Sequence, residues 1–340
     1  MIRVGVIGLG MMGATHLDVY ARHDDVEVVA ISDLNPRRLS GEELAIGNID
    51  GQAEGGFDIR NAKVKRYDEG KKLIRNKHLD LVDVCLPTPL HVSYAQLALR
   101  KGLHVMVEKP VGRTYRDAKK LIEAAAAANG FTMVGMCMRF WPGWTWLKEA
   151  VVNQTYGRVR SACFRRVTSH PGGPFYRDGE ACGGALLDLH VHDIDFIYYL
   201  FGVPQKVFSV GYSTITSAID HIVTQYEYDE VPIVVAEGGW TMTEGFGFSM
   251  RYTVVFERAT ALFDVGAQTP LVLYEKDRQP QVIEVEPGLG YEHEIAYFLD
   301  CIDQGTPPST VTAADAAVSV KISEAEARSA LTRHSVKVTV

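Results

Sequence analysis

A carboxylate and an imidazole lie four residues apart in the middle of the chain. On a helix, Asp188 and His192 would share one face. A carboxylate one turn away can fix the tautomer of an imidazole and raise its basicity. The spacing therefore predicts that His192 acts as a general base oriented by Asp188. Asp195, three residues further on, could reach the same face.

The same stretch also invites a metal-site interpretation. Five potential ligands fall within eight residues, namely Asp188, His190, His192, Asp193 and Asp195. On a helix, however, His190 and His192 point apart, and the His-Glu-x-x-His spacing of zinc sites is absent. We therefore expect no metal in this stretch. A polar helix start capped by Asp188 is the plain alternative to a catalytic role.

A lysine ends a predicted strand in the first half of the chain. Lys109 stands between Glu108 and Pro110, so it would lie on a rigid and partly buried turn. Such a lysine can hydrogen-bond a substrate hydroxyl or have its pKa lowered. On this triplet alone, a solvated strand-end lysine is the simpler interpretation.

A glycine loop near the N-terminus follows a short apolar run. Residues 3–7 are β-prone and lead into Gly8-Leu9-Gly10-Met11-Met12-Gly13, before a helix-like segment at 17–22. In that context Gly8 permits a tight turn, Gly10 a close approach to a pyrophosphate, and Gly13 close helix packing. The helix N-terminus adds unpaired N–H groups. The pattern predicts a dinucleotide-binding loop rather than a bare glycine-rich turn.

The end of the next strand indicates which dinucleotide binds. Residues 26–32 form a second apolar run that ends at Asp33, 20 residues after Gly13, where a carboxylate would bind ribose hydroxyls. Asp33 would repel a 2′-phosphate, so NAD is favoured. Arg37 and Arg38 keep NADP possible, although both could be simple surface charges.

Alternating strand and helix patterns through residue 138 predict a parallel sheet with helices on both faces. Ligands of such sheets gather beyond the carboxyl ends of the strands, where loops 8–13, 87–91 and 108–110 would lie. Residues 41–61 look like a surface insertion.

From about 158 to 285 closely spaced strand-like runs predict a largely antiparallel sheet, with helices at 188–201, 292–304 and 313–332. A length of 340 residues favours two domains.

Composition and charge exclude several classes of protein. The chain has 46% hydrophobic and 23% charged residues and a net charge of −7, so a soluble globular protein is expected and nucleic acid is not an expected partner. No apolar run reaches the ~18–20 residues of a membrane span, and no signal peptide is recognisable. Five dispersed cysteines indicate reduced thiols, so we expect a cytoplasmic protein.

Five motifs in order resemble those of the Gfo/Idh/MocA oxidoreductases. The pair formed by Glu-Lys-Pro and Asp-x-x-x-His is far more specific than the glycine loop, and the resemblance covers nearly the whole chain. The motifs are Gly8-Leu9-Gly10-Met11-Met12-Gly13 with His16, Pro87-Thr88-Pro89-Leu90-His91, Glu108-Lys109-Pro110, Met138-Arg139-Phe140, and Gly183-Gly184-Ala185-Leu186-Leu187-Asp188 with His192 and Asp195.

The resemblance implies an α/β fold with two domains. Residues 1–138 would form a Rossmann domain with a doubly wound parallel sheet, and residues 139–340 an α+β domain with a large, mostly antiparallel open sheet. It implies NAD(P)-dependent hydride transfer between a nicotinamide cofactor and a secondary alcohol or ketone of a sugar, cyclitol or related polyol. A homodimer or homotetramer is also implied, because the large sheet commonly forms an interface in this family.

The family's functional residues carry over to the matching positions. Lys109, Asp188 and His192 become the catalytic set, and Glu108 and Pro110 would help hold the nicotinamide end. The predicted cofactor contacts are Gly8, Gly10, Met11, Met12, Gly13, Asp33, Pro87, Thr88, His91, Glu108, Lys109 and Pro110. The predicted substrate contacts are Lys109, Asp188 and His192 of the catalytic set and Arg139, together with Trp141, Tyr176 and Arg177 from the chain's own aromatic run and the loop at 170–177.

Two features depart from the family pattern. His190 stands where many members have a small residue, so the pocket beside His192 is expected to be altered. The aromatic run from Phe140 to Trp146 either packs between the domains or stacks on a sugar ring, and we favour packing for at least one tryptophan. The loop at 170–177 could close over the substrate.

Two other functions stay open. One is an NAD-dependent glycosidase, which uses the same fold and releases free sugar without net NADH. The other is a non-catalytic NAD-binding regulator. The joint presence of Lys109, Asp188 and His192 argues against the regulator, because a binding module need not keep all three.

Overall fold

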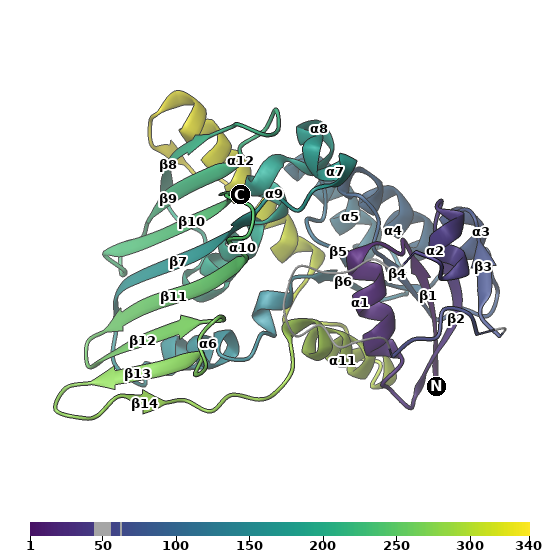
Figure 1. Ribbon diagram of the computed structural model, residues 1–340, viewed down its shortest axis with the longest axis horizontal. Helices are drawn as coiled ribbons and strands as arrows, with labels where there is room; N and C mark the ends of the chain where they lie inside the picture. The colour runs from purple at the N-terminus through teal and green to yellow at the C-terminus, as the bar shows by residue number, and fades with distance from the viewer. Residues whose placement is uncertain (44–55, 62) are drawn as a thin grey trace. The chain divides into compact units, whose positions relative to one another are not determined.

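The computed structural model describes residues 1–43, 56–61 and 63–340 (Figure 1). The chain forms two compact units: an N-terminal unit of Met1–Cys137 with Tyr291–Ala317, and a C-terminal unit of Met138–Gly290 with Val318–Val340. The expected division at residue 138 differs from these units in one segment, because 291–317 packs with the N-terminal unit. Most of the predicted insertion at 41–61 lies outside the described residues.

The N-terminal unit is built on a six-stranded parallel sheet in the order β3-β2-β1-β4-β5-β6. The strand order reverses between β1 and β4, and ligands of open α/β sheets bind at such a switch point. The prediction of a parallel sheet is confirmed. The strands are β1 (Ile2–Ile7), β2 (Val26–Ser32), β3 (Lys65–Tyr67), β4 (Leu81–Val84), β5 (His104–Glu108) and β6 (Thr132–Gly135).

Helices α1 to α5 lie between these strands in the sequence, α11 comes from the later segment, and two N-caps illustrate the local signals that start helices. In α5, Thr114 is the N-cap: its hydroxyl oxygen accepts from the Asp117 N–H at 3.1 Å and its hydroxyl donates to the Asp117 carboxylate. The α2 N-cap, Asn35, accepts from the Arg37 N–H. The helices are α1 (Met11–Tyr20), α2 (Pro36–Ser40), α3 (Gly70–Leu73), α4 (His91–Leu99), α5 (Tyr115–Ala126) and α11 (Gly290–Asp303).

The C-terminal unit is built on a nine-stranded sheet in the order β14-β13-β12-β11-β7-β10-β9-β8-β15 (Figure 1). Every neighbouring pair is antiparallel except β7 and β10, so the predicted mostly antiparallel sheet is confirmed. The strands are β7 (Val159–Ser169), β8 (Lys206–Tyr212), β9 (His221–Glu227), β10 (Ile233–Met242), β11 (Phe248–Phe256), β12 (Ala259–Asp264), β13 (Leu271–Glu275), β14 (Gln281–Val282) and β15 (Val336–Lys337).

One face of this sheet carries the core of the unit. Trp144 is fully buried and packs edge-on against Phe196 and Tyr252 and tilted against Phe164. Trp144 of the aromatic run therefore serves packing, but its ring partners lie inside the C-terminal unit and not between the domains, as was expected for at least one tryptophan. The helices are α6 (Trp144–Val152), α7 (Gly173–Arg177), α8 (Gly179–Cys182), α9 (Gly184–Asp188), α10 (Val191–Phe201) and α12 (Ala313–Thr332), whose first five residues belong to the N-terminal unit.

The single helix expected at 188–201 is wrong. The structure has two helices, α9 ending at Asp188 and α10 beginning at Val191, with a turn at residues 189–190. Across the turn the His190 N–H donates to the Ala185 carbonyl, one residue further back than in an α-helix. Among the described helices, none has the length and apolar character needed to cross a bilayer.

Candidate functional site

The glycine loop joins β1 to α1 and leaves space where a ligand needs it. Gly8 has φ +94°, and a Cβ there would lie 2.3 Å from the Cys85 carbonyl oxygen. A Cβ on Gly13 would lie 1.8 Å from the Gly8 carbonyl oxygen, so both positions require glycine for the turn itself. A Cβ on Gly10, by contrast, would have Arg38 Nη1 as its nearest neighbour, 4.0 Å away.

That open position lies at the start of α1, which begins at Met11 and has no side-chain cap. The first N–H groups of a helix have no partner within the helix, and they can bind phosphate. The side-chain-free space at Gly10 and these N–H groups fit a dinucleotide pyrophosphate. Met11 and Met12 supply the first two of these N–H groups.

Asp33 ties the end of β2 to the glycine loop. Its Oδ2 accepts from the Leu9 N–H and its Oδ1 from the Asn35 N–H, both at 2.7 Å. Arg38 Nη1 lies 3.9 Å from Asp33 Oδ2, while Arg38 Nε donates to Glu43 at 3.2 Å. Asp33 thus presents a fixed carboxylate beside the loop, as ribose binding requires.

Two further loops meet at His91. Pro87 and Thr88 lead into a 3-10 helix, η1 (Thr88–Leu90), which continues into α4 at His91. The buried His91 contacts the Pro110 carbonyl oxygen through Nδ1 at 2.8 Å and the Leu86 carbonyl oxygen through Nε2. Burial lowers the pKa of His91, and these two carbonyls oppose that shift. His91 therefore joins the loop after β4 to the loop after β5.

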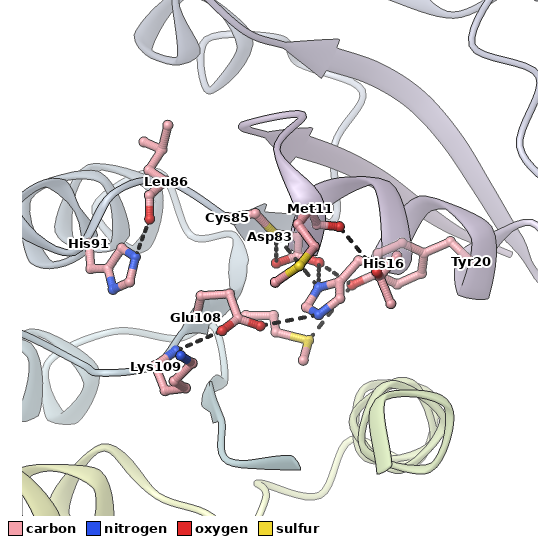
Figure 2. Close-up of polar contacts among 11 residues, drawn as sticks. Met11, His16, Tyr20, Asp83, Cys85, Leu86, His91, Glu108 and Lys109 are labelled. Carbon is pink, nitrogen blue, oxygen red and sulfur yellow. Dashed lines mark hydrogen bonds and ion pairs between the residues drawn. The ribbon is translucent and has the colours of Figure 1, made fainter. Parts of the chain in front are cut away.

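Lys109 follows β5 on a turn that Glu108 helps to fix. The Lys109 N–H donates to Glu108 Oε2 at 3.1 Å (Figure 2). The Lys109–Pro110 peptide bond is cis. Glu108 is 5% exposed, and its Oε1 faces His16 Nε2 at 3.3 Å. The carboxylate is therefore a structural partner of both the turn and α1.

His16 is the centre of a buried polar cluster (Figure 2). Its Nδ1 lies 2.7 Å from Asp83 Oδ2, which also accepts from the Tyr20 hydroxyl at 3.0 Å. Cys85 Sγ lies 3.4 Å from Asp83 Oδ1. Burial disfavours the charged form of His16, but Asp83 and Cys85 raise its pKa well above the ordinary value.

Asp83, Tyr20 and Glu294 belong to none of the sequence motifs described above. A signal was present for Asp83, because it is a charged residue inside an otherwise apolar run, Leu79 to Leu86, whose residues 81–84 are all buried. Tyr20 and Glu294 have no such sequence signal, because polar side chains are common on helices. Asp83 has no measurable exposure in the structure.

The C-terminal unit holds Asp188 and His192 on either side of the 189–190 turn. Asp188 is the last residue of α9, and His192, 8% exposed, lies in the first turn of α10. They do not share the face of one continuous helix, and Asp188 is not a helix N-cap. Gly183 and Gly184, at φ +87° and +69°, lead the chain into α9.

The other polar residues of this stretch have their own partners. Asp195 receives a bidentate contact from Arg139 at 2.8 Å and a hydrogen bond from Ser319 at 2.9 Å. Asp193 pairs with Arg166 at 2.8 Å. His190 Nε2 lies 3.4 Å from Glu326 Oε2 and 3.3 Å from the Tyr226 hydroxyl. Arg139 and Asp195 thus anchor α10, and His190 links the residue before α10 to Glu326 and Tyr226.

The remaining predicted substrate contacts lie in the same unit. Trp141 is 5% exposed and Arg139 4% exposed. Tyr176 packs with Phe175 against a cluster of Cys182, Ala185 and Trp240, and Arg177, the last residue of α7, is exposed. Lys109 belongs to the N-terminal unit, whereas Arg139, Trp141, Tyr176, Arg177, Asp188 and His192 belong to the C-terminal unit.

Comparison with known proteins places both halves of the chain in one family. Residues 2–136 match the model of the oxidoreductase family with an NAD-binding Rossmann fold, and residues 144–262 match the Gfo/Idh/MocA C-terminal domain. A myo-inositol 2-dehydrogenase of Thermotoga maritima is 26% identical over 99% of this chain and 98% of its own. A D-glucoside 3-dehydrogenase of Escherichia coli K12 is 29% identical over 60% of this chain and 55% of its own.

Solved structures share the fold over the full length. A levoglucosan dehydrogenase in complex with NADH superposes with a TM-score of 0.84 at 21% identity, covering 99% of each chain. The WlbA dehydrogenase of Bordetella pertussis, in complex with NADH and UDP-GlcNAcA, gives 0.81 at 18% identity, covering 100% of this chain and 99% of its own. With the two family models together spanning most of its length, the chain belongs to the Gfo/Idh/MocA oxidoreductases, enzymes with an NAD-binding Rossmann domain.

Proposed function

We propose that this protein is an NAD-dependent dehydrogenase that oxidises a secondary alcohol of a sugar, cyclitol or related polyol, or reduces the corresponding ketone. The observation that carries this proposal is the family match across both units, joined to a glycine loop whose open position fits a dinucleotide. The relatives named above act on inositol and glucosides by their names, which supports a polyhydroxylated substrate.

Bound NAD would accept the hydride, and residues of the chain itself would take up and hold the proton. We assign His192 as the base that accepts the hydroxyl proton of the substrate. Asp188 orients His192, and Lys109 stabilises the developing alkoxide. Two observations are compatible with these roles: His192 is 8% exposed in the first turn of α10, and the Lys109 turn is fixed through Glu108.

The remaining contacts follow the same scheme. NAD is held by the loop at 8–13, by Asp33 at the ribose, and by residues of the 87–91 and 108–110 loops. On the substrate side, Trp141, Tyr176 and Arg177 would contact the sugar. Arg139 is included in the proposal, although its bidentate pair with Asp195 leaves it mainly a support for α10.

Assembly and location complete the proposal. The face of the C-terminal sheet opposite Trp144 exposes apolar side chains in three adjacent strands, namely Phe208, Val210, Tyr212, Val223 and Ile233, each at least 40% exposed. Contiguous apolar surface of this kind favours association, so we propose a homodimer or homotetramer formed through this face. All five cysteines are free, which suits the reducing cytoplasm.

The test is NADH formation with a panel of inositols, aldoses and sugar acids, with NADP in parallel. One substrate should give stoichiometric NADH, and His192→Ala should lower turnover by ~10²–10⁴-fold with NAD affinity unchanged. His334→Ala, at an exposed histidine, is the control. Release of free sugar without net NADH would identify a glycosidase instead, and tight NAD binding without any turnover would identify a regulator.

A further inference from the structure

Three potential metal ligands from separate segments converge inside the N-terminal unit. His16 lies on α1, Glu108 ends β5, and Glu294 lies on α11. One ligand atom of each lies within 4.8 Å of the other two. His16 and Glu294 have no measurable exposure, and Glu108 is 5% exposed. The dehydrogenase reaction gives His16 and Glu294 no role.

Several atoms of this group lack the hydrogen bonds that burial demands. Among the described residues, neither carboxylate oxygen of Glu294 has a hydrogen-bond partner, and neither does His16 Nε2. The 3.3 Å contact between His16 Nε2 and Glu108 Oε1 is close but is not a hydrogen bond. Buried polar atoms are nearly always paired, so unpaired ones that face each other indicate a missing bound species.

The other ring nitrogen of His16, Nδ1, already has a hydrogen-bond partner. His16 Nδ1 donates to Asp83 Oδ2 at 2.7 Å, and the Tyr20 hydroxyl donates to the same oxygen (Figure 2). With Nδ1 bound to a carboxylate, Nε2 is the ring nitrogen that faces Glu108, and it becomes a metal ligand when its proton is released. Metal-binding histidines characteristically donate their second nitrogen to a carboxylate in this way, which fixes the tautomer and the ring orientation.

We propose that His16, Glu108 and Glu294 bind one divalent transition-metal ion, with Zn²⁺ as its representative. One imidazole nitrogen and two carboxylates suit Zn²⁺, whereas Mg²⁺ and Ca²⁺ prefer oxygen ligands alone. Ligands at about 2.0–2.1 Å in a tetrahedron lie about 3.3–3.4 Å apart. The distance between His16 Nε2 and Glu108 Oε1, 3.3 Å, has this value. The two carboxylates balance the charge of the ion.

A neighbouring group of similar composition does not make the same site. His16, Asp83 and Cys85 also lie within 4.8 Å of one another. These side chains already satisfy each other, because Asp83 Oδ2 accepts from His16 and Tyr20 while Cys85 Sγ contacts Asp83 Oδ1 at 3.4 Å. Asp83 is therefore the residue that positions His16 rather than a ligand.

The site has a structural consequence for the fold. The chain reaches α11 only after it has passed through the C-terminal unit, yet residues 291–317 pack with the N-terminal unit. A metal ion held by α1, β5 and α11 would fasten this late helix to the Rossmann sheet. It would also hold Glu108, whose other oxygen accepts from the Lys109 N–H.

The competing explanation is a trapped water beside a protonated Glu294. Burial and the nearby Glu108 raise the pKa of Glu294 well above its ordinary value, so a neutral side chain is chemically reasonable when no metal is bound. The two explanations differ in their response to metal. Only the metal site predicts that the wild-type chain binds Zn²⁺ through Glu294.

The experiment uses the full chain, stripped with a chelator and titrated with Zn²⁺ by calorimetry and thermal unfolding. We expect one Zn²⁺ per chain and, at 100-fold excess over Kd, a rise in Tm of about 3–5 °C, with no rise in Mg²⁺. Glu294→Gln keeps the shape but should weaken Zn²⁺ binding by at least about 10–100-fold. Glu292→Gln, on the same helix and paired with Arg22 at the surface, should bind as wild type.

Two results would overturn the site. One is a wild-type chain without a Zn²⁺-dependent shift in Tm, which would point to the trapped water. The other is Zn²⁺ binding that Glu294→Gln leaves unchanged, which would place the metal elsewhere. Should Glu294→Gln fail to fold, crystals of the wild-type chain grown with Zn²⁺ decide, because an anomalous peak among His16, Glu108 and Glu294 is required.

Discussion

Replacing Asp33 with asparagine is expected to shift the cofactor preference from NAD toward NADP. In the structure both carboxylate oxygens of Asp33 already hold loop N–H groups, those of Leu9 and Asn35, at 2.7 Å. The ribose hydroxyls of NAD would use the remaining lone pairs of the same carboxylate. An asparagine has one oxygen to offer, and it carries no charge to repel a 2′-phosphate.

The size of the shift follows from two separate terms. Exchanging a charged acceptor for a neutral one costs about 1–1.5 kcal/mol for the hydrogen bond, so NAD should lose about 5–13-fold in kcat/KM. A unit charge about 6 Å from a phosphate, at an effective dielectric constant near 20, contributes about 3 kcal/mol of repulsion. Solvent screening reduces this to about 2 kcal/mol, which is about 30-fold in favour of NADP. The ratio of the two kcat/KM values should therefore change by about 10²–10³.

The assay measures kcat/KM for NAD and NADP at one fixed concentration of the best substrate. Asp18→Asn is the matched control, because the Asp18 carboxylate also accepts two backbone N–H groups, from Gly56 and Phe57, but lies on α1 away from the β2 end. A ratio that Asp33→Asn changes by less than about threefold would refute the assignment of Asp33 to the ribose.

The remaining predictions concern the loop and the folding of each unit. Gly10→Ala should leave Tm near wild type, because the nearest atom to the new Cβ is 4.0 Å away, yet weaken NAD binding at least about 10-fold in a fluorescence titration. Gly13→Ala should instead cost about 2–3 kcal/mol in denaturant unfolding, since its Cβ would lie 1.8 Å from the Gly8 carbonyl oxygen; equal stability of the two variants would contradict this. Burial opposes the ionisation of Asp220, but hydrogen bonds from residues 214–216 lower its pKa below 3.8. A lowered pKa in the folded state stabilises the protein above the unfolded pKa and loses that contribution as pH falls through the folded value. The stability of the wild type should therefore fall more steeply below pH ~4 than that of Asp220→Asn, as urea unfolding at pH 3 to 6 would show.

The elements of the N-terminal unit could be predicted because their signals are local. An apolar run followed by spaced glycines determines a strand, a turn and a helix within about 20 residues of chain. At Gly13 the cause is local as well, because a Cβ there would meet the Gly8 carbonyl oxygen of the same turn, whereas at Gly8 it would meet the Cys85 carbonyl oxygen just after β4. The parallel order of the strands then brings the loops after β1, β4 and β5 to one edge of the sheet.

The cluster around His16 could not be predicted in this way, because its members are distant in sequence. Asp83 and Glu294 lie 67 and 278 residues after His16, and no periodicity in the chain relates them. Asp83 alone could be recognised from the sequence, because a carboxylate is unusual inside a strand that is buried on both faces. Its partners depend on which helices cover β4, and that is decided by tertiary packing.

The turn between Asp188 and His192 shows a different limit of sequence reasoning. The spacing of four predicts a shared face only on an ideal helix, and nothing between the two residues is a helix breaker. The break arises from packing: the His190 side chain lies against Gly238 of β10, where a Cβ would be 2.4 Å from His190 Nδ1, and its Nε2 faces Glu326 and Tyr226. Holding His190 inward at that point separates α9 from α10, so His192 starts a new helix. The glycine at 238 that makes room for this histidine lies 48 residues away, in another strand, so a pattern within 188–195 does not contain the cause.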